Sequence, residues 1–168
     1  MKKIILFIIS LLFCLYLTAC TNTRIDFKVS YDYMNVFGHK EVDGKYQCFS
    51  DAYINSQEQL ISLCDEWKNK SFNDKDDEYQ SYLSTLLRQY NDDYFQLNNL
   101  IIIEFETGQV IYTKIKSINF EEDRLIVNII QKQRNGIWTT EAFRWLIIVE
   151  IPKDSTNDVN ELVVNFKK

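Results

Sequence analysis

Apolar and polar residues follow a period of two in the first part of the chain. Residues 27–33 carry an apolar side chain at every second position, which is the pattern of a half-buried strand. An Asp-Gly pair at 43–44 predicts a turn, and a second strand pattern covers residues 46–54. We therefore expect these two segments to form a β-hairpin.

The middle of the chain changes to a helical period. A capping box over residues 56–59 begins a helix that we expect to end near Lys70, with apolar residues three and four positions apart. A second helix is predicted over residues 79–90, with acidic residues at its start and Arg88 near its end, as the helix macrodipole favours. Each predicted helix has one apolar face that requires a core.

From residue 100 onward the period returns to that of strands. Short turns separate most of these segments, and short connections favour antiparallel pairing. The sequence therefore predicts an α+β fold, an antiparallel β meander of about six or seven strands packed with one or two amphipathic helices. The late strands are expected over residues 100–105, 110–120, 125–132, 143–151 and 162–166.

The N-terminus has a continuous apolar run instead of a periodic pattern. Lys2 and Lys3 precede apolar residues 4–17, which are interrupted only by Ser10. A helix that crosses a bilayer needs roughly 20 apolar residues, and this run is shorter. A charged start followed by a short apolar run predicts an export signal.

The residues that end this run are Leu17, Thr18, Ala19 and Cys20. An ordinary signal cleavage site needs small residues at the first and third positions before the cut, and Leu17 stands third. The four residues instead resemble the lipobox of bacterial lipoproteins, in which the Cys receives a diacylglycerol thioether and a peptidase cleaves in front of it. The predicted organisation is a cleaved signal peptide over 1–19, a lipidated Cys with a short tether over 20–24, and a single domain over 25–168.

A diacylglycerol group at Cys20 would decide where the protein resides. Two acyl chains hold a protein stably on a membrane, whereas one chain holds it only marginally. The lipobox therefore implies an extracytoplasmic protein that is anchored to the cell membrane, in the outer leaflet of the cytoplasmic membrane if the cell is Gram-positive.

The charge of the predicted mature chain argues against a nucleic-acid partner. Removal of Lys2 and Lys3 with the leader lowers the basic count from 19 to 17 against 24 acidic residues, a net charge of −7. Beyond Lys167 and Lys168 the chain has no basic cluster that would neutralise phosphates.

Two cysteines, Cys48 and Cys64, remain in the predicted mature domain besides Cys20. An even pair in an exported chain suggests a disulfide. The alternative is two buried thiols, because Cys64 lies on the apolar face of the first helix. With His39 as the sole imidazole, the spacing fits no zinc site, so we expect no metal and no cofactor.

Candidate catalytic and binding residues are few. Glu104 and Glu106 would share one face of a strand, the arrangement of a carboxylate pair for glycoside hydrolysis, but two acids beside a turn are more often simply solvated. Trp67 and Trp145 fall on apolar periodicities and are expected in the core. Trp138 instead stands in a polar segment, where it is either a lid on the core or, with Thr139 and Thr140, an interaction loop. We assign no catalytic residue.

The segment from residue 90 to residue 152 resembles the PrcB C-terminal-like domain of bacterial surface lipoproteins. The resemblance rests on the YNDDYF sequence at 90–95, on the apolar strand and turn after it, and on the spacing of Thr140, Glu141 and Trp145 before the late strand. It implies a noncatalytic surface lipoprotein, and the namesake of the family is associated with a protease complex.

We therefore expect a membrane-tethered extracytoplasmic lipoprotein that acts as a noncatalytic protein-interaction or complex-stabilising module. Its partner would be an envelope protein, with a protease complex as the candidate that the resemblance suggests. The alternative is an envelope ligand-binding or hydrolytic domain that uses surface carboxylates and Trp138.

Overall fold

The computed structural model describes residues 23–33, 41–42, 45–46, 51–70, 77–108, 111–136, 142–156 and 158–167. The predicted leader with its lipobox (Leu17, Thr18, Ala19 and Cys20) lies outside these ranges, as do His39, Cys48, Trp138, Thr139 and Thr140.

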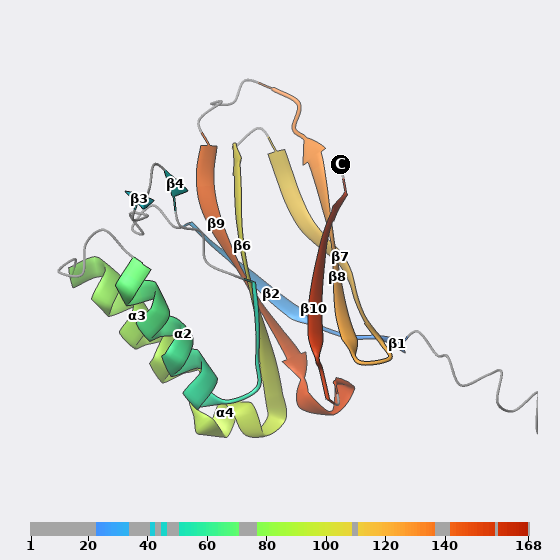
Figure 1. Cartoon of the computed structure of the whole chain (residues 1–168). Coiled ribbons are helices and arrows are strands. Elements are labelled where there is room, and N and C mark those ends of the chain that lie inside the picture. The colour runs from blue at the N-terminus through green and yellow to red at the C-terminus, as the bar shows by residue number, and fades with distance from the viewer. Residues whose placement is uncertain are drawn as a thin grey trace, which may run out of the picture.

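The described chain forms three layers (Figure 1). Three helices lie against one face of a sheet with the strand order β2-β9-β6-β5, and a second sheet with the order β1-β7-β8-β10 lies against its other face. The helices are α2 (Gln57–Lys70), α3 (Asp77–Gln89) and α4 (Asp92–Leu97). The first sheet comprises β2 (Lys28–Tyr33), β5 (Ala52–Ile54), β6 (Asn98–Gly108) and β9 (Ala142–Pro152). The second comprises β1 (Thr23–Arg24), β7 (Ile111–Glu121), β8 (Arg124–Gln133) and β10 (Glu161–Lys167).

The predicted α+β class is confirmed, but the single antiparallel meander is wrong. The described residues form eight strands in two sheets, besides the short pair β3 (Glu41–Val42) and β4 (Lys45–Tyr46). The β7–β8 hairpin is in one sheet while β6 and β9 pair in the other, and β10 runs parallel to β8. The number of strands therefore exceeds the prediction, and one pair is parallel.

The physical reason for two sheets is visible in the apolar pattern of the strands. In β6, Leu100 and Ile102 contact the helix side while Ile101 and Ile103 contact the second sheet. A strand that is apolar at consecutive positions has to be covered on both faces. The β8 strand instead alternates between buried and half-buried positions, and this alternation suits an outer layer.

The predicted hairpin between residues 27–33 and 46–54 is also wrong. Strand β2 pairs antiparallel with β9, and β5 pairs antiparallel with β6. The pair formed by β3 and β4 flanks the predicted turn at 43–44. The partner strands β9 and β6 are the two central strands of the first sheet. The pairing of β2 and β5 therefore depends on residues far away in the sequence.

The start of α2 confirms the predicted capping box, with one change. The Ser56 hydroxyl oxygen accepts a hydrogen bond from the Gln59 backbone N–H at 3.3 Å. The Gln59 side-chain oxygen accepts from the N–H of Asn55, at 2.9 Å, and not from that of Ser56. The helix is thus capped reciprocally, as the sequence predicts.

The short helix α4 is not among the elements that the apolar pattern predicts. The Asn91 side chain accepts a hydrogen bond from the Tyr94 backbone N–H at 3.1 Å, so Asn91 is the N-cap. Asp92 and Asp93 follow in the first turn, where negative charge is favourable. The signal was present in the sequence, but a helix of six residues is too short to show a clear apolar period.

Two apolar cores lie on the two faces of the first sheet. The helix-side core contains Cys64 and Trp67, both fully buried, and this confirms the prediction that Trp67 is a core residue. The core between the sheets consists mainly of isoleucine and valine from β6, β7, β8 and β9. Within the described residues, no helix is long and apolar enough to cross a membrane.

Candidate functional site

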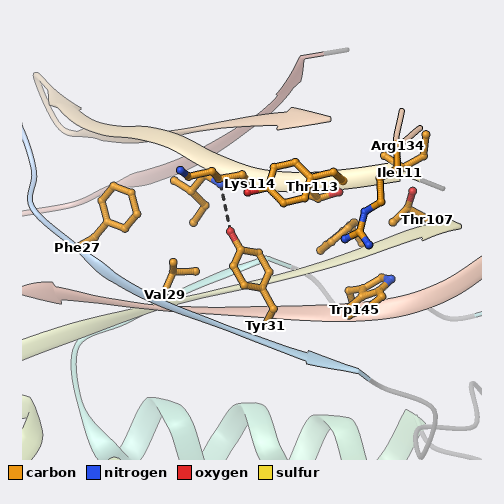
Figure 2. Close-up of a pocket in the computed structure, with 12 residues that line it drawn as sticks. Phe27, Val29, Tyr31, Thr107, Ile111, Thr113, Lys114, Arg134 and Trp145 are labelled. Carbon is orange, nitrogen blue, oxygen red and sulfur yellow. Dashed lines mark hydrogen bonds between the residues drawn. The ribbon is translucent and has the colours of Figure 1, made fainter. Parts of the chain in front are cut away.

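An apolar cavity of about 370 Å³ lies at one end of the space between the two sheets. We call it the β2–β7 cavity, because the edge strand β2 and the strand β7 form two of its walls. Figure 2 shows Phe27, Val29 and Tyr31 pointing from the β2 side toward β7, with Trp145 of β9 beside them. Its volume falls within the range of sites that bind ligands in proteins.

The alternation of β2 explains why its aromatic and apolar side chains enter the cavity. Successive side chains of a strand point to opposite faces, so Val29 and Tyr31 face the second sheet while Asp32 faces the helices. Because β2 is the edge of its sheet, these side chains are not fully covered: Val29 is 38% exposed and Tyr31 is 37% exposed. The cavity therefore presents apolar surface to solvent.

A hydrogen bond connects the two walls. The backbone N–H of Ile115 on β7 donates to the Tyr31 hydroxyl oxygen at 3.3 Å, as the dashed line in Figure 2 shows. Burial raises the pKa of the Tyr31 hydroxyl above its usual value, and the bond from Ile115 partly offsets that rise. Just beyond this point the register between β7 and β8 shifts by one residue, between Ile115 and Ser117.

The polar residues that line the cavity carry hydroxyls, cations and the indole N–H of Trp145. Lys114 and Arg134 are the two charged residues among the described ones that line it, and both are basic. The Arg134 guanidinium carbon lies 5.7 Å from the centre of the Tyr112 ring, within the distance of a cation–π interaction. In a chain with a net charge of −5, this end of the β7–β8 hairpin is locally basic.

The predicted interaction loop is adjacent to this cavity in the sequence. Trp138, Thr139 and Thr140 lie outside the described residues, but Arg134 before them and Trp145 after them both line the cavity. Whether Trp138 is a lid or an anchor therefore stays a prediction.

Trp145, which the apolar alternation predicts to be a core residue, also lines the cavity. Its neighbours on the same strand face, Ile147 and Val149, are fully buried, as the alternation predicts. Trp145 itself is half-buried and lines the cavity. The sequence pattern identified the face correctly, but it contained no signal for the point along β9 where the core ends.

Within the described ranges, the other candidate side chains do not come together into a second reactive site. Cys64 is buried in the helix-side core, and its predicted disulfide partner Cys48 lies outside the described residues, so the disulfide stays a prediction. Glu104 is half-buried on β6, and its backbone N–H donates to the Asp51 carboxylate at 3.2 Å. Burial raises the pKa of the Asp51 carboxyl, the hydrogen bond from the Glu104 backbone N–H partly offsets that rise, and the charge of the Glu104 carboxylate adds a smaller rise. Among the described residues no cluster of His, Cys, Asp and Glu is suited to a metal ion.

A second cavity, of about 530 Å³, is polar and lies where β5, β6 and the 3-10 helix η1 (Lys153–Ser155) meet. The buried Asn99 side-chain amide donates to the Tyr53 hydroxyl at 2.8 Å and to the Thr156 hydroxyl at 2.9 Å. The Lys153 ammonium donates to the Phe95 carbonyl oxygen at 2.8 Å. These bonds connect η1 to the sheet and to α4, and this gives the network a structural role.

Comparison of the chain with protein-family models, with curated proteins and with solved structures finds no match. The resemblance to the PrcB C-terminal-like domain accordingly stays a prediction from the sequence.

Proposed function

We propose that this protein is a membrane-tethered extracytoplasmic binding module, and that the β2–β7 cavity is where it holds an apolar group of an envelope protein. The observation that carries the proposal is the cavity itself, with aromatic walls, a basic rim and partly exposed apolar side chains at the edge of the sandwich. Aromatic and apolar side chains in a concave site supply most of the binding energy in protein recognition.

The tether is the part of the proposal that rests on the sequence alone. Leu17, Thr18, Ala19 and Cys20 predict lipidation, and β1 begins at Thr23, only three positions after Cys20. A few residues span at most about 3.6 Å each, so a lipid at Cys20 would keep the domain close to the membrane. Partners within reach would be other proteins of the same membrane surface.

The chemistry of the cavity favours binding over catalysis. The described polar residues that line it are Tyr31, Tyr112, Thr107, Thr113, Trp145, Lys114 and Arg134. A hydroxyl nucleophile needs a neighbouring general base such as His or a carboxylate, and the described lining contains neither. We therefore propose a noncatalytic role for this site.

Site-specific photocrosslinking in the native host tests this proposal. A photoreactive phenylalanine analogue replaces Tyr112 at the cavity, and the same analogue replaces Ile61 on α2 as a control that is equally exposed, at 43%. We expect a single covalent adduct with an envelope protein from position 112 and none from position 61. Equal labelling at both positions, or no adduct at position 112, would contradict the proposal.

A further inference from the structure

The outer edge of β7 is only partly covered by another strand. On one side β7 pairs with β8 along its whole length. On the other side β1 pairs only at its far end, where Thr23 lies opposite Phe120 and Arg24 lies opposite Asn119. The Ile25 backbone N–H adds one bond to the Ile118 carbonyl oxygen at 2.9 Å. Strand pairing on this side therefore stops near Ile118.

The bond between Ile115 and Tyr31 reveals the direction of the remaining edge groups. The Ile115 N–H points away from β8, because it donates to the Tyr31 hydroxyl on the opposite wall of the cavity. In an antiparallel ladder, N–H and C=O groups point toward and away from the partner strand at alternate residues. The register between β7 and β8 is continuous from Ile111 to Ile115, so the N–H and C=O groups of Ile111 and Thr113 also point outward.

These outward groups form an open strand edge beside the cavity. Within the described part of the chain, no strand pairs with this side of β7 at Ile111 or Thr113. Both residues line the cavity, next to Tyr31 and Trp145 (Figure 2). Two residues with outward groups offer two donors and two acceptors. A row of such groups is a template for pairing with another chain.

We propose that an extended segment of a partner protein adds as a strand to the β7 edge at Ile111 and Thr113, with an apolar side chain in the β2–β7 cavity and acidic residues beside it. This inference rests on the proposed binding function and specifies its mode. Strand addition combines main-chain hydrogen bonds, which give affinity, with pockets for alternate side chains, which give specificity.

The acidic character of the segment follows from the distribution of charge along the β7–β8 hairpin. Lys114 and Arg134 line the cavity, and the exposed Lys116 and Lys132 lie on the same half of the hairpin. The acidic residues of this hairpin are Glu121, Glu122 and Asp123, at or next to the turn at its opposite end. A basic rim attracts an acidic segment and disfavours a basic one.

The geometry also limits the length of the added strand. From Ile111 to Ile115 the strand advances four residues, or about 14 Å at roughly 3.4 Å per residue. The Tyr31 hydroxyl occupies the edge donor at Ile115, so pairing ends there. We expect a segment of about five residues with one principal side chain in the cavity, since side chains on one face of a strand recur at every second position.

Selection from a displayed library of random nine-residue peptides tests this mode on the full lipidated protein in nanodiscs. We expect enriched peptides to carry an apolar residue flanked by Asp or Glu, and we then synthesise the strongest binder. We then prepare two N-methylated versions of that peptide, one methylated at the odd-numbered and one at the even-numbered backbone nitrogens. One of the two versions should bind the wild-type protein at least tenfold more weakly than the unmethylated peptide. The side chains are unchanged in these peptides, so such a loss reports on main-chain pairing.

Two variants of Thr113 test the same edge from the protein side. Thr113→Pro removes the outward N–H, and proline is tolerated at a strand edge where its nitrogen faces outward. Thr113→Val is the matched control, because it also removes the hydroxyl that accepts a bond from the Gln131 side chain, but it keeps the backbone N–H. We expect Thr113→Pro to weaken peptide binding at least tenfold and Thr113→Val to change it less than threefold.

The outcomes separate this inference from the proposed function. One outcome is a peptide that binds the wild-type protein equally well in both N-methylated versions but fails to bind the Trp145→Ala protein. This result would leave the cavity as a binding site and overturn strand addition. Failure to enrich any peptide over a Trp145→Ala control would overturn both.

A concentration-dependent dimer that dissociates in Thr113→Pro would overturn the proposed occupant, because the edge would then pair with a second copy of the chain. If Thr113→Pro does not fold, the N-methylated peptides on the wild-type protein decide the question.

Discussion

At the scale of single residues, the three tryptophans have different environments. Trp67 is fully buried in the helix-side core, whereas Trp145 is half-buried at the β2–β7 cavity. Trp138 lies outside the described residues. The same residue type therefore supports the fold at one position and, under our proposal, binds a partner at another.

Alanine substitutions at two of these positions should separate stability from binding. Trp67→Ala removes a fully buried ring and should lower the free energy of unfolding by about 3 to 5 kcal/mol. Trp145→Ala removes a ring that is half-covered and should cost less, about 1 to 3 kcal/mol, while it weakens partner binding by about 2 kcal/mol or more. Urea unfolding and titration of the selected peptide measure the two effects. A larger stability loss at Trp145 than at Trp67 would show that Trp145 belongs mainly to the core.

At the scale of elements, tyrosines attach the helix layer to the first sheet. The Tyr82 hydroxyl on α3 donates to the Asp32 carboxylate on β2 at 2.9 Å. The Tyr90 hydroxyl, just after α3, donates to the Glu150 carboxylate on β9 at 3.5 Å. Because each phenol donates to a carboxylate, its neutral form is required for the contact.

The stability of this attachment should fall at alkaline pH. Burial, followed by the Glu150 charge, raises the pKa of Tyr90 to about 12, from an ordinary value of about 10. Burial and the Asp32 charge raise the pKa of Tyr82 as well. A raised phenol pKa stabilises the folded state fully below pH 10, where the unfolded tyrosine is still neutral, and this contribution is lost as the pH rises from about 10 through about 12.

Urea unfolding at a series of pH values between 7 and 12 measures this loss, with tyrosinate absorbance as a second signal. We expect the free energy of unfolding to decrease between about pH 10 and pH 12, and to decrease less steeply in Tyr90→Phe. Tyr112→Phe is the control for the loss of one phenol, since that ring is 43% exposed on β7. An unchanged slope in Tyr90→Phe would contradict this assignment.

At the scale of the whole molecule, the predicted lipid anchor and the cavity would together define the function. The domain carries the proposed binding site on β2, β7 and β9, and the predicted anchor at Cys20 would restrict that site to a membrane surface. Binding of a partner in the same membrane would gain from this restriction, because tethering raises the effective concentration of two binding groups.

Cys20→Ser tests the anchor directly. Serine has no thiol for the diacylglycerol thioether, so the variant should accumulate as a precursor that retains residues 1–19 and incorporates no fatty acid. Metabolic labelling with palmitate and intact-mass measurement in the native host detect both changes. Ala19→Gly keeps a small residue before the Cys and should still be processed. Normal processing of Cys20→Ser would show that the lipobox assignment is wrong.

The longer elements of this protein follow from local patterns that the sequence contains. The predicted strand at 125–132 corresponds to Arg124–Gln133, and the predicted helix from the capping box corresponds to Gln57–Lys70. Each of these patterns needs only neighbouring residues, because the period of apolar positions and the cap act within a few positions of the chain. The α+β class follows from the order of these elements.

Tertiary structure alone decided which strands pair and where the cavity lies. Strand β2 pairs with β9 at a separation of more than a hundred residues, and β10 joins β8 in parallel. Local periodicity is the same whichever partner a strand takes, so pairing depends on how the two apolar faces of β6 and β9 are covered. The β2–β7 cavity exists because two strand edges from different sheets face each other, an arrangement that no segment of the sequence encodes by itself.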